Sequence, residues 1–477
     1  MDKNSKKLLK ILALLLCEAN NIGGMKSSAS ENRNLQLITQ NSKNINKTNK
    51  ENTNWIKQNP IKPLLIGGVP IVALLTIGGI LVHNCFVNNK KDTEFGKTYK
   101  NSDFSNKWEA LCHFLGENAT KFVKENYPEW EERLNHQDFQ VDRRHLFSLM
   151  SIAYSLRLAA EKNYNYLDKN NNELLLGKNL GKIELQKNAH TVKKRLEKVI
   201  VEDEDILRSA HRFILKNPQF SNCFGILNAG SPYRPNGGLE WGCGALEEYL
   251  SMHTTLVRDL SGKAFKVDDK NKDQGFYMEE KDYPPACGCN EDIEDKNTIM
   301  QRLERDFYYE RGIMSKNVKL IRSLGDLDKY YQNDETFLWK HPDKTFAEFD
   351  PPKDGIGAVK FRVLSIVGLE DASTDQGQRP GILDKCGEES EIYKKWEEVT
   401  KIQCEFVLKA FIKEKVKVPF LCAFSAGAFG GKASMVAKCF KELLIDEGYI
   451  DYFDYVVFPI GYSEANFKAF KNEFSKK

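Results

Sequence analysis

The segment Leu227–Leu256 constrains the fold and chemistry of this chain more than any other part of its 477 residues. It reads LNAGSPYRPNGGLEWGCGALEEYLSMHTTL, so glycine-rich turns precede two adjacent glutamates and an apolar helical pattern follows them. The backbone of Asn236–Gly238 is able to adopt positive φ and approach a ligand closely, and such loops present the successive N–H groups that bind a diphosphate. Glu247 and Glu248 beside this loop favour acid catalysis at a sugar attached to the phosphate. The alternative is a surface turn before an ordinary helix.

A second loop of small residues lies near the C-terminus. The apolar run Phe420–Phe424 predicts a short strand buried on both faces, and Pro419 is tolerated at the start of such a strand. Ser425–Gly431 then reads SAGAFGG, and Ser434–Leu444 carries apolar residues at helical spacing. A strand, a glycine loop and a helix in this order deliver a helix N-terminus to a phosphate. We interpret Phe429 as a surface that covers a ligand ring; the alternative is a packing residue.

The two loops together resemble those of the microbial-type poly(ADP-ribose) glycohydrolases, a family built on a macrodomain. That family carries a Gly-Gly-Gly run, a short spacer and then Gln-Glu-Glu. Asn236-Gly237-Gly238, a spacer of seven residues and Leu246-Glu247-Glu248 are similar to this motif. Leu227-Asn228-Ala229 is similar to the segment before the motif, and Ser425–Gly431 to the family's later phosphate loop. With insertions, the resemblance runs from about Leu156 to Ile460.

The resemblance implies hydrolysis of the ribose–ribose glycosidic bond in poly(ADP-ribose) or a related ADP-ribose conjugate, with no cofactor and no metal ion. Glu248 corresponds to the family's catalytic acid and is expected to protonate the departing ribose oxygen. Glu247, the second residue expected in catalysis, and Asn228 are expected to hold ribose hydroxyls. The residues expected to bind the ligand are Asn228, Asn236, Gly237, Gly238, Ser425, Ala426, Gly427, Ala428, Phe429 and Gly430.

The chain departs from the family at four positions of these motifs. Leu246 replaces Gln and removes an amide able to orient the ligand or the acids. Asn236 replaces a glycine, and asparagine tolerates the left-handed conformation better than other non-glycine residues. Ser425 and Ala426 replace Gly and Cys. An ADP-ribose-binding module without turnover is therefore an alternative function, and a membrane-tethered interaction protein is another.

Composition places the chain among globular proteins. Hydrophobic residues make up 41% of the chain and charged residues 29%, which is too apolar for a disordered protein. The net charge of +3 does not predict binding to nucleic acid. The 11 cysteines are an odd number, and several, such as Cys422 and Cys439, lie in apolar runs, which favours buried reduced thiols over a disulfide framework. We expect a monomer.

The N-terminal part carries two apolar segments. Residues 1–24 contain Lys6-Lys7 ahead of a short apolar run, as in a secretory signal. Residues 25–62, rich in Asn, Ser and Lys, predict a disordered tether. Residues 63–82 hold twenty uncharged residues, enough for one transmembrane helix; the alternative is a buried core helix. We expect a single-pass membrane protein with its catalytic domain in the cytosol, and the sequence leaves secretion into a host open.

Helical spacing dominates residues 97–150, which we expect to form a helical spacer, and residues 151–465 are expected to form the macrodomain-like glycohydrolase domain. Within it, strand-like runs alternate with helical patterns, which predicts an α/β fold with a three-layer mixed sheet and flanking helices. Loops that follow strands place the ligand at the C-terminal edge of the sheet. The predicted strands are Phe224–Leu227, Val318–Ile321, Val363–Val367, Phe420–Phe424 and Tyr455–Ile460.

Overall fold

The structure is a computed structural model of the chain, which divides into two compact units, residues 1–91 and 92–477. The predicted signal-like segment 1–24 and tether 25–62 lie outside the described residues. The structure describes residues 65–66, 69–70, 106–135, 143–162, 171–185, 191–231, 234–241, 243–261, 276–277, 296–304, 309–322, 324, 351–369, 371, 381–427, 429–461 and 463–475.

The first unit contains two short strands where the sequence predicted a transmembrane helix. β1 (Leu65–Ile66) and β2 (Val69–Pro70) pair in antiparallel fashion, so the helix predicted over 63–82 is wrong for these four residues. The Gly67-Gly68 pair lowers the helix propensity of this stretch of sequence. The rest of 63–82 lies outside the described residues. No helix in the described part of the chain is long and apolar enough to cross a membrane.

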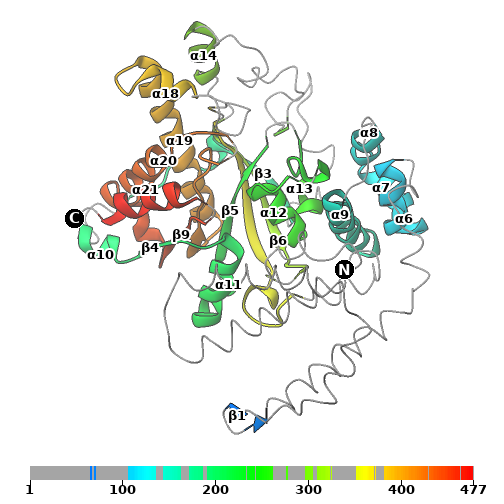
Figure 1. The fold of residues 1–477 in the computed structure, drawn as a ribbon. Helices are drawn as coiled ribbons and strands as arrows, with labels where there is room; N and C mark the ends of the chain where they lie inside the picture. Colours follow the sequence, from blue (N-terminus) through cyan, green and yellow to red (C-terminus); the bar gives the residue numbers. More distant parts are fainter. Residues whose placement is uncertain are drawn as a thin grey trace, which may run out of the picture. The chain divides into compact units, whose positions relative to one another are not determined.

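The second unit is built around a mixed sheet of seven strands in the order β3-β6-β7-β5-β8-β9-β4 (Figure 1). β7, β5, β8, β9 and β4 are parallel, whereas β6 is antiparallel to both of its neighbours. The predicted mixed α/β class is therefore confirmed. The strands are β3 (Asn172–Leu176), β4 (Val199–Glu202), β5 (Phe224–Gly230), β6 (Arg311–Val318), β7 (Phe361–Val367), β8 (Val418–Phe420) and β9 (Val456–Pro459).

Helices cover both faces of this sheet. Gly225 of β5 faces Phe411 of α19, whereas Ile226 points to the opposite face because side chains alternate along a strand. Phe420, the ladder partner of Ile226, contacts the ring of Phe213 in α11 on that opposite face. The helices are α6 (Lys107–Leu115), α7 (Glu117–Asn126), α8 (Glu129–Asn135), α9 (Arg143–Glu161), α10 (Val192–Leu196), α11 (Ile206–Lys216), α12 (Leu246–His253), α13 (Leu256–Leu260), α14 (Lys296–Leu303), α18 (Ile382–Cys386), α19 (Glu391–Lys413), α20 (Ala433–Lys441) and α21 (Glu464–Ser475).

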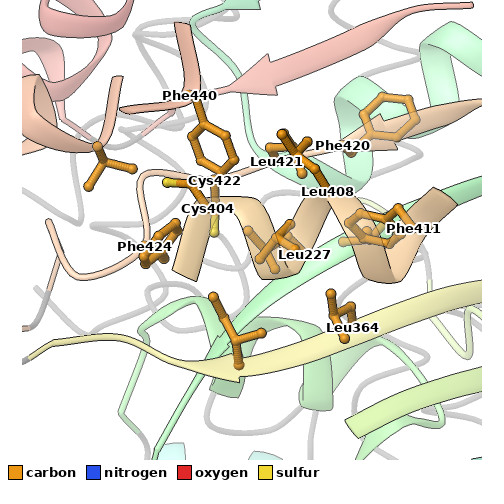
Figure 2. Close-up of a cluster of buried hydrophobic side chains, with 14 of the residues drawn as sticks. Leu227, Leu364, Cys404, Leu408, Phe411, Phe420, Leu421, Cys422, Phe424 and Phe440 are labelled. Carbon is orange, nitrogen blue, oxygen red and sulfur yellow. The ribbon is translucent and has the colours of Figure 1, made fainter. Parts of the chain in front are cut away.

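The main core lies between the sheet and α19. Figure 2 shows Leu227 of β5 and Leu364 of β7 pointing toward Leu408 and Phe411 of α19, all fully buried. A fully buried leucine or phenylalanine contributes about 1.5–3 kcal/mol to folding, so this layer holds the strands that carry the functional loops. Cys404 lies in the same layer. The predicted buried thiols are confirmed for Cys422 and Cys439, which are both buried and free.

Three predicted strands, those near β5, β7 and β9, are confirmed, and the others differ. β8 ends at Phe420, where the sequence predicted a strand to begin, because the apolar residues that follow are buried but leave the ladder. β6 ends at Val318, the start of another predicted strand. The short strands β3 and β4 were not predicted.

The helices before the matched motifs are packed directly on the domain that follows. Residues of α6, α8 and α9 form a second apolar cluster with Leu239, Met252 and Val257, which flank or belong to α12 and α13. The predicted boundary at residue 150 falls inside α9. This segment therefore contacts, through Leu239, the glycine-rich loop between β5 and α12, an arrangement that the sequence did not predict for a spacer.

Candidate active site

The first predicted loop connects β5 to α12 and has the backbone that the sequence predicted. Asn236 and Gly237 both have positive φ, of 66° and 59°. A Cβ added to Gly237 would lie 2.9 Å from Cδ of Glu248 and closer still to its Oε1. Glycine is therefore required at this position for two reasons, the left-handed backbone and the close approach of the carboxyl group.

The side chain of Asn236 is buried and points away from the site. Its Oδ1 accepts a hydrogen bond from the Ser251 hydroxyl (2.9 Å), and its Nδ2 donates to the Val257 carbonyl (3.2 Å) and to Ser261 Oγ (3.1 Å). The amide of Asn236 therefore fixes the loop to α12 and α13, and the expected contact of Asn236 with ligand stays a prediction. Only its backbone N–H faces the glutamates.

Glu247 and Glu248 lie in the first turn of α12 and are only 3% and 6% exposed. Both oxygens of Glu247 accept backbone N–H groups, Oε2 from Ser231 (2.7 Å) and Oε1 from Asn236 (3.1 Å). Oε1 of Glu248 accepts the Gly238 N–H at 2.6 Å. Its Oε2 is buried and has no hydrogen-bond partner among the described residues. Glu248 therefore presents the unengaged carboxyl oxygen of the pair, as a group that exchanges a proton with substrate requires.

The surroundings favour the protonated form of both acids. Burial, followed by the neighbouring charge of Glu248, raises the pKa of Glu247 well above its ordinary value. Burial also raises the pKa of Glu248, and the N–H of Gly238 opposes part of this rise. Two buried carboxyl groups side by side resist simultaneous ionisation. The pair can therefore hold a proton at a pH where an exposed glutamate is ionised.

Asn228 lies in β5, one residue before Ala229, and is fully buried. Its Nδ2 donates to Ser365 Oγ across the β5–β7 ladder at 2.9 Å. Its Oδ1 has no hydrogen-bond partner in the described part of the chain. This oxygen is the group that the predicted ribose contact of Asn228 would use.

The second predicted loop follows β8 and is also held in left-handed turns. Ser425 and Gly430 have φ of 65° and 72°, and the Gly431 N–H donates to the Ser425 carbonyl at 2.8 Å. The Ser425 hydroxyl is buried without a hydrogen-bond partner among the described residues. Ala428 lies outside the described residues. α20 begins two residues after Gly431 with no side-chain cap. The Met435 N–H already donates to the Lys432 carbonyl at 3.1 Å, so the N–H groups of Ala433 and Ser434 are those available to an anion.

A third loop, after β7, supports the second. A Cβ added to Gly368 would lie 2.5 Å from Ser425 Oγ, so the two loops are in close contact. The Asp371 N–H donates to the Phe429 carbonyl (2.7 Å), and Asp371 Oδ1 accepts from the Leu383 N–H (2.9 Å). Burial raises the pKa of Asp371 to about 6. Phe429 is thus fixed through its backbone, and its ring is half-buried.

These loops meet at one edge of the sheet because β7, β5 and β8 are parallel neighbours. A cavity of about 470 Å³ lies at the ends of β4 and β9, about 14 Å from β5 when three strand spacings are counted. The glutamates, the small-residue loop and this cavity therefore succeed one another along the edge. The cavity is lined by Glu202, Asp203, Glu204, Asp205, Arg208, Arg212 and Gly461.

Sequence reasoning missed three polar groups beside the glutamates. Arg133 of α8 forms an ion pair with Glu240 (2.7 Å), whose side chain is only 1% exposed. Tyr277 is fully buried, its hydroxyl has no hydrogen-bond partner among the described residues, and burial together with the charge of Glu247 raises its pKa well above the ordinary value. Arg133 and Tyr277 lie outside the recognised motif, and Glu240 lies in its seven-residue spacer. No group of three or more His, Cys, Asp or Glu side chains in the described ranges is arranged to hold a metal ion.

The fold and site define an α/β domain with a buried carboxyl pair at the carboxyl edge of its sheet, the arrangement of a glycoside-cleaving enzyme. Residues 149–323 match the family described as "Microbial-type PARG, catalytic domain". The matched segment is therefore similar to the catalytic domain of the microbial-type poly(ADP-ribose) glycohydrolases. The match includes the first loop and both glutamates, whereas Ser425–Gly430 lies beyond it.

Solved structures similar to this chain include two bacterial poly(ADP-ribose) glycohydrolases. The enzyme from Thermomonospora curvata is 17% identical, with 69% of this chain and 98% of that one covered and a TM-score of 0.41. The enzyme from Deinococcus radiodurans in complex with ADP-ribose is 16% identical, with 64% and 94% covered and a TM-score of 0.38. No curated protein matches the chain.

Proposed function

We propose that this chain hydrolyses ribose–ribose glycosidic bonds in poly(ADP-ribose), or in a related ADP-ribose conjugate, and releases ADP-ribose. The observation that carries the proposal is the free, buried Oε2 of Glu248 within the family-matched segment. A buried acid with one unengaged oxygen suits proton donation to a leaving group.

The order of features along the sheet edge supports an extended ligand with a sugar at one end and a diphosphate in the middle. The reacting ribose lies at Glu248, the diphosphate at the small-residue loop after β8, and the distal end of the ligand at the cavity lined by Asp205 and its neighbours. In this arrangement Phe429 covers the ribose. Partners of this kind are poly(ADP-ribose) itself or an ADP-ribosylated protein.

In the proposed reaction Glu248 Oε2 donates its proton to the departing ribose oxygen as the glycosidic C–O bond breaks. The electron pair of that bond leaves with the oxygen, and the remaining sugar becomes oxocarbenium-like. Water adds to this carbon and releases a proton to the Glu248 carboxylate, which restores the acid. Glu247 keeps lone pairs beyond its two backbone hydrogen bonds and, with Oδ1 of Asn228, accepts ribose hydroxyls.

The test is release of ADP-ribose from labelled poly(ADP-ribose) by the full-length chain. Glu248→Gln keeps the shape of the side chain but cannot donate the proton, so we expect a loss of about 10²–10⁴-fold in kcat with ADP-ribose binding retained. Glu398→Gln, at an exposed position of α19, is the matched control. Equal rates for wild type and Glu248→Gln would remove Glu248 from the mechanism.

A second candidate function is an ADP-ribose-binding module without turnover, and Leu246 is the observation that favours it. Leu246 is half-buried and packs against the core, so it supplies no polar group at the position where the family has Gln. This function predicts that wild type binds ADP-ribose in calorimetry but releases none from the polymer. Gain of turnover in Leu246→Gln would assign the loss to this position.

We also propose that the chain acts as a monomer tethered to a membrane by its apolar N-terminal part, with the catalytic domain in the cytosol. The support is the sequence alone, because residues 63–82 are uncharged and largely apolar. Protease protection of sealed vesicles tests the orientation: digestion of the catalytic domain by protease added at the cytosolic side is expected. Protection of that domain would reverse the orientation, and recovery of the chain in the soluble fraction would remove the anchor.

A further inference from the structure

The helical segment α6–α8 lies before the family-matched residues and yet reaches the catalytic loop. Lys107 of α6 is fully buried and donates to the Glu240 carbonyl at 3.0 Å. The Trp130 indole N–H of α8 donates to Ser261 Oγ (3.1 Å), the atom that also accepts from the Asn236 amide. One polar contact therefore joins this segment to the loop directly, and a second joins it to Ser261, which binds the loop residue Asn236. The apolar cluster that the segment shares with Leu239 adds to these contacts.

Arg133 of α8 makes the most extensive of these contacts. Its guanidinium donates to Glu240 Oε1 through Nη2 (2.7 Å) and Nε (3.2 Å), to the Pro235 carbonyl through Nη1 (2.9 Å), and to the Gly237 carbonyl through Nη2 (3.4 Å). The guanidinium also lies over the ring of Trp130, 4.7 Å from its centroid. The Arg133 side chain is 16% exposed, so most of its surface is covered by neighbouring groups.

The two carbonyls that Arg133 binds belong to the same peptide groups that hold the glutamates. The peptide that carries the Pro235 carbonyl also carries the Asn236 N–H, which donates to Glu247. The peptide that carries the Gly237 carbonyl also carries the Gly238 N–H, which donates to Glu248. In a trans peptide the C=O and N–H groups point in opposite directions, and no cis peptide occurs among the described residues. Arg133 therefore binds the carbonyl side of the two peptide groups whose N–H groups donate to Glu247 and Glu248, and so fixes the orientation of both donors.

We propose that Arg133 is a positioning residue that aligns Glu247 and Glu248 through these two peptide groups. α8 is thereby part of the catalytic unit, although it lies outside residues 149–323. The inference rests on the proposed function for its kinetic consequences but not for its structural ones. Glu240 neutralises the guanidinium, and the planar fork of arginine meets a carboxylate and two carbonyls at once, which the single ammonium of a lysine cannot do.

The experiment compares Arg133→Ala and Arg133→Lys with Arg195→Ala in the full-length chain. Arg195 is the matched control because it also forms a buried ion pair, with Asp451 at 2.8 Å, but it binds the Ile445 carbonyl far from the glutamates in the chain. A displaced acid costs about 10²-fold in rate per ångström. We therefore expect kcat on poly(ADP-ribose) to fall about 10–100-fold in both Arg133 variants, with KM changed little and Arg195→Ala within about twofold of wild type.

The pH titration of Glu247 separates positioning from general loss of stability. The charge of Arg133 opposes the rise in the pKa of Glu247 that burial and Glu248 cause. NMR titration of the Glu247 carboxyl group is therefore expected to give a higher pKa in Arg133→Ala than in wild type and the wild-type pKa in Arg133→Lys, which keeps the charge. Arg195→Ala is expected to lower the melting temperature without moving this titration. An Arg133→Lys variant with wild-type kcat would overturn the positioning role.

Hydrogen exchange gives a readout that does not depend on turnover. Amides in the segment 231–245 are expected to exchange faster in both Arg133 variants than in wild type, and at the wild-type rate in Arg195→Ala. Unchanged exchange in this segment in both Arg133 variants would overturn the inference. If wild type releases no ADP-ribose, the proposed function fails, whereas the exchange result still decides whether Arg133 holds the loop.

Discussion

Replacing Gly237 with alanine tests how closely the loop fits the catalytic pair. The added Cβ would lie 2.9 Å from Cδ of Glu248 and 3.2 Å from Oε2 of Glu247, whereas carbon atoms pack at roughly 3.5–4.0 Å. The Glu248 carboxyl group therefore has to move by about 1 Å, and a displacement of this size costs about 10²-fold in rate. The left-handed backbone adds a further penalty of about 1–2 kcal/mol to the free energy of folding.

The control for the backbone penalty is Gly387→Ala. Gly387 has φ of 71°, and an added Cβ there meets no atom within 4 Å. Both variants are therefore expected to lose about 1–2 kcal/mol of unfolding free energy in urea titrations. Only Gly237→Ala is expected to lose about 10²-fold in kcat on labelled poly(ADP-ribose). Equal kcat values for the two variants would refute the close fit between Gly237 and the carboxyl group.

Three other perturbations have defined outcomes. Burial raises the pKa of Asp371 to about 6 from 3.8, so the folded state retains a proton that the unfolded chain releases, and stability falls as pH rises through this window. The unfolding free energy of Asp371→Asn relative to wild type is therefore expected to rise between about pH 4 and 7, and a difference that does not change with pH would contradict the raised pKa of Asp371. Gly225→Ala places a Cβ 2.7 Å from Phe411 Cε1 and is expected to lower the unfolding free energy by about 1–3 kcal/mol. A stability equal to that of wild type would contradict the tight contact between Gly225 and Phe411 of α19. Asn236→Gly keeps the positive φ but removes the side-chain bonds to α12 and α13, so a loss of about 1–3 kcal/mol is expected in thermal unfolding, and a gain in stability would contradict the structural role of this amide.

Two of the predicted strands show which features of a strand a sequence pattern predicts and which it does not. Val363–Val367 was predicted correctly because a strand covered by helices on both faces needs a continuous apolar run, and β7 lies between two such layers. The run Phe420–Phe424 has the same composition, yet only its first residue belongs to β8. Burial requires only apolar side chains, whereas a β-ladder also requires a neighbouring strand in the right register. The residues of the run do not determine which strand lies beside it.

The sequence by itself determined the local features of the site. Two adjacent glutamates follow Gly237 after a short spacer, and this pattern predicts a carboxyl pair beside a loop with left-handed backbone. The prediction is possible because the φ range open to glycine and the distance between residues close in sequence are properties of the local chain. Only the tertiary structure decided which groups surround that pair. Arg133 reaches Glu240 across 107 positions of sequence, and the Asn236 side chain turns into the core instead of toward a ligand. The packing of α8, α12 and α13 on the loop sets these two results, and packing depends on the path of the whole chain.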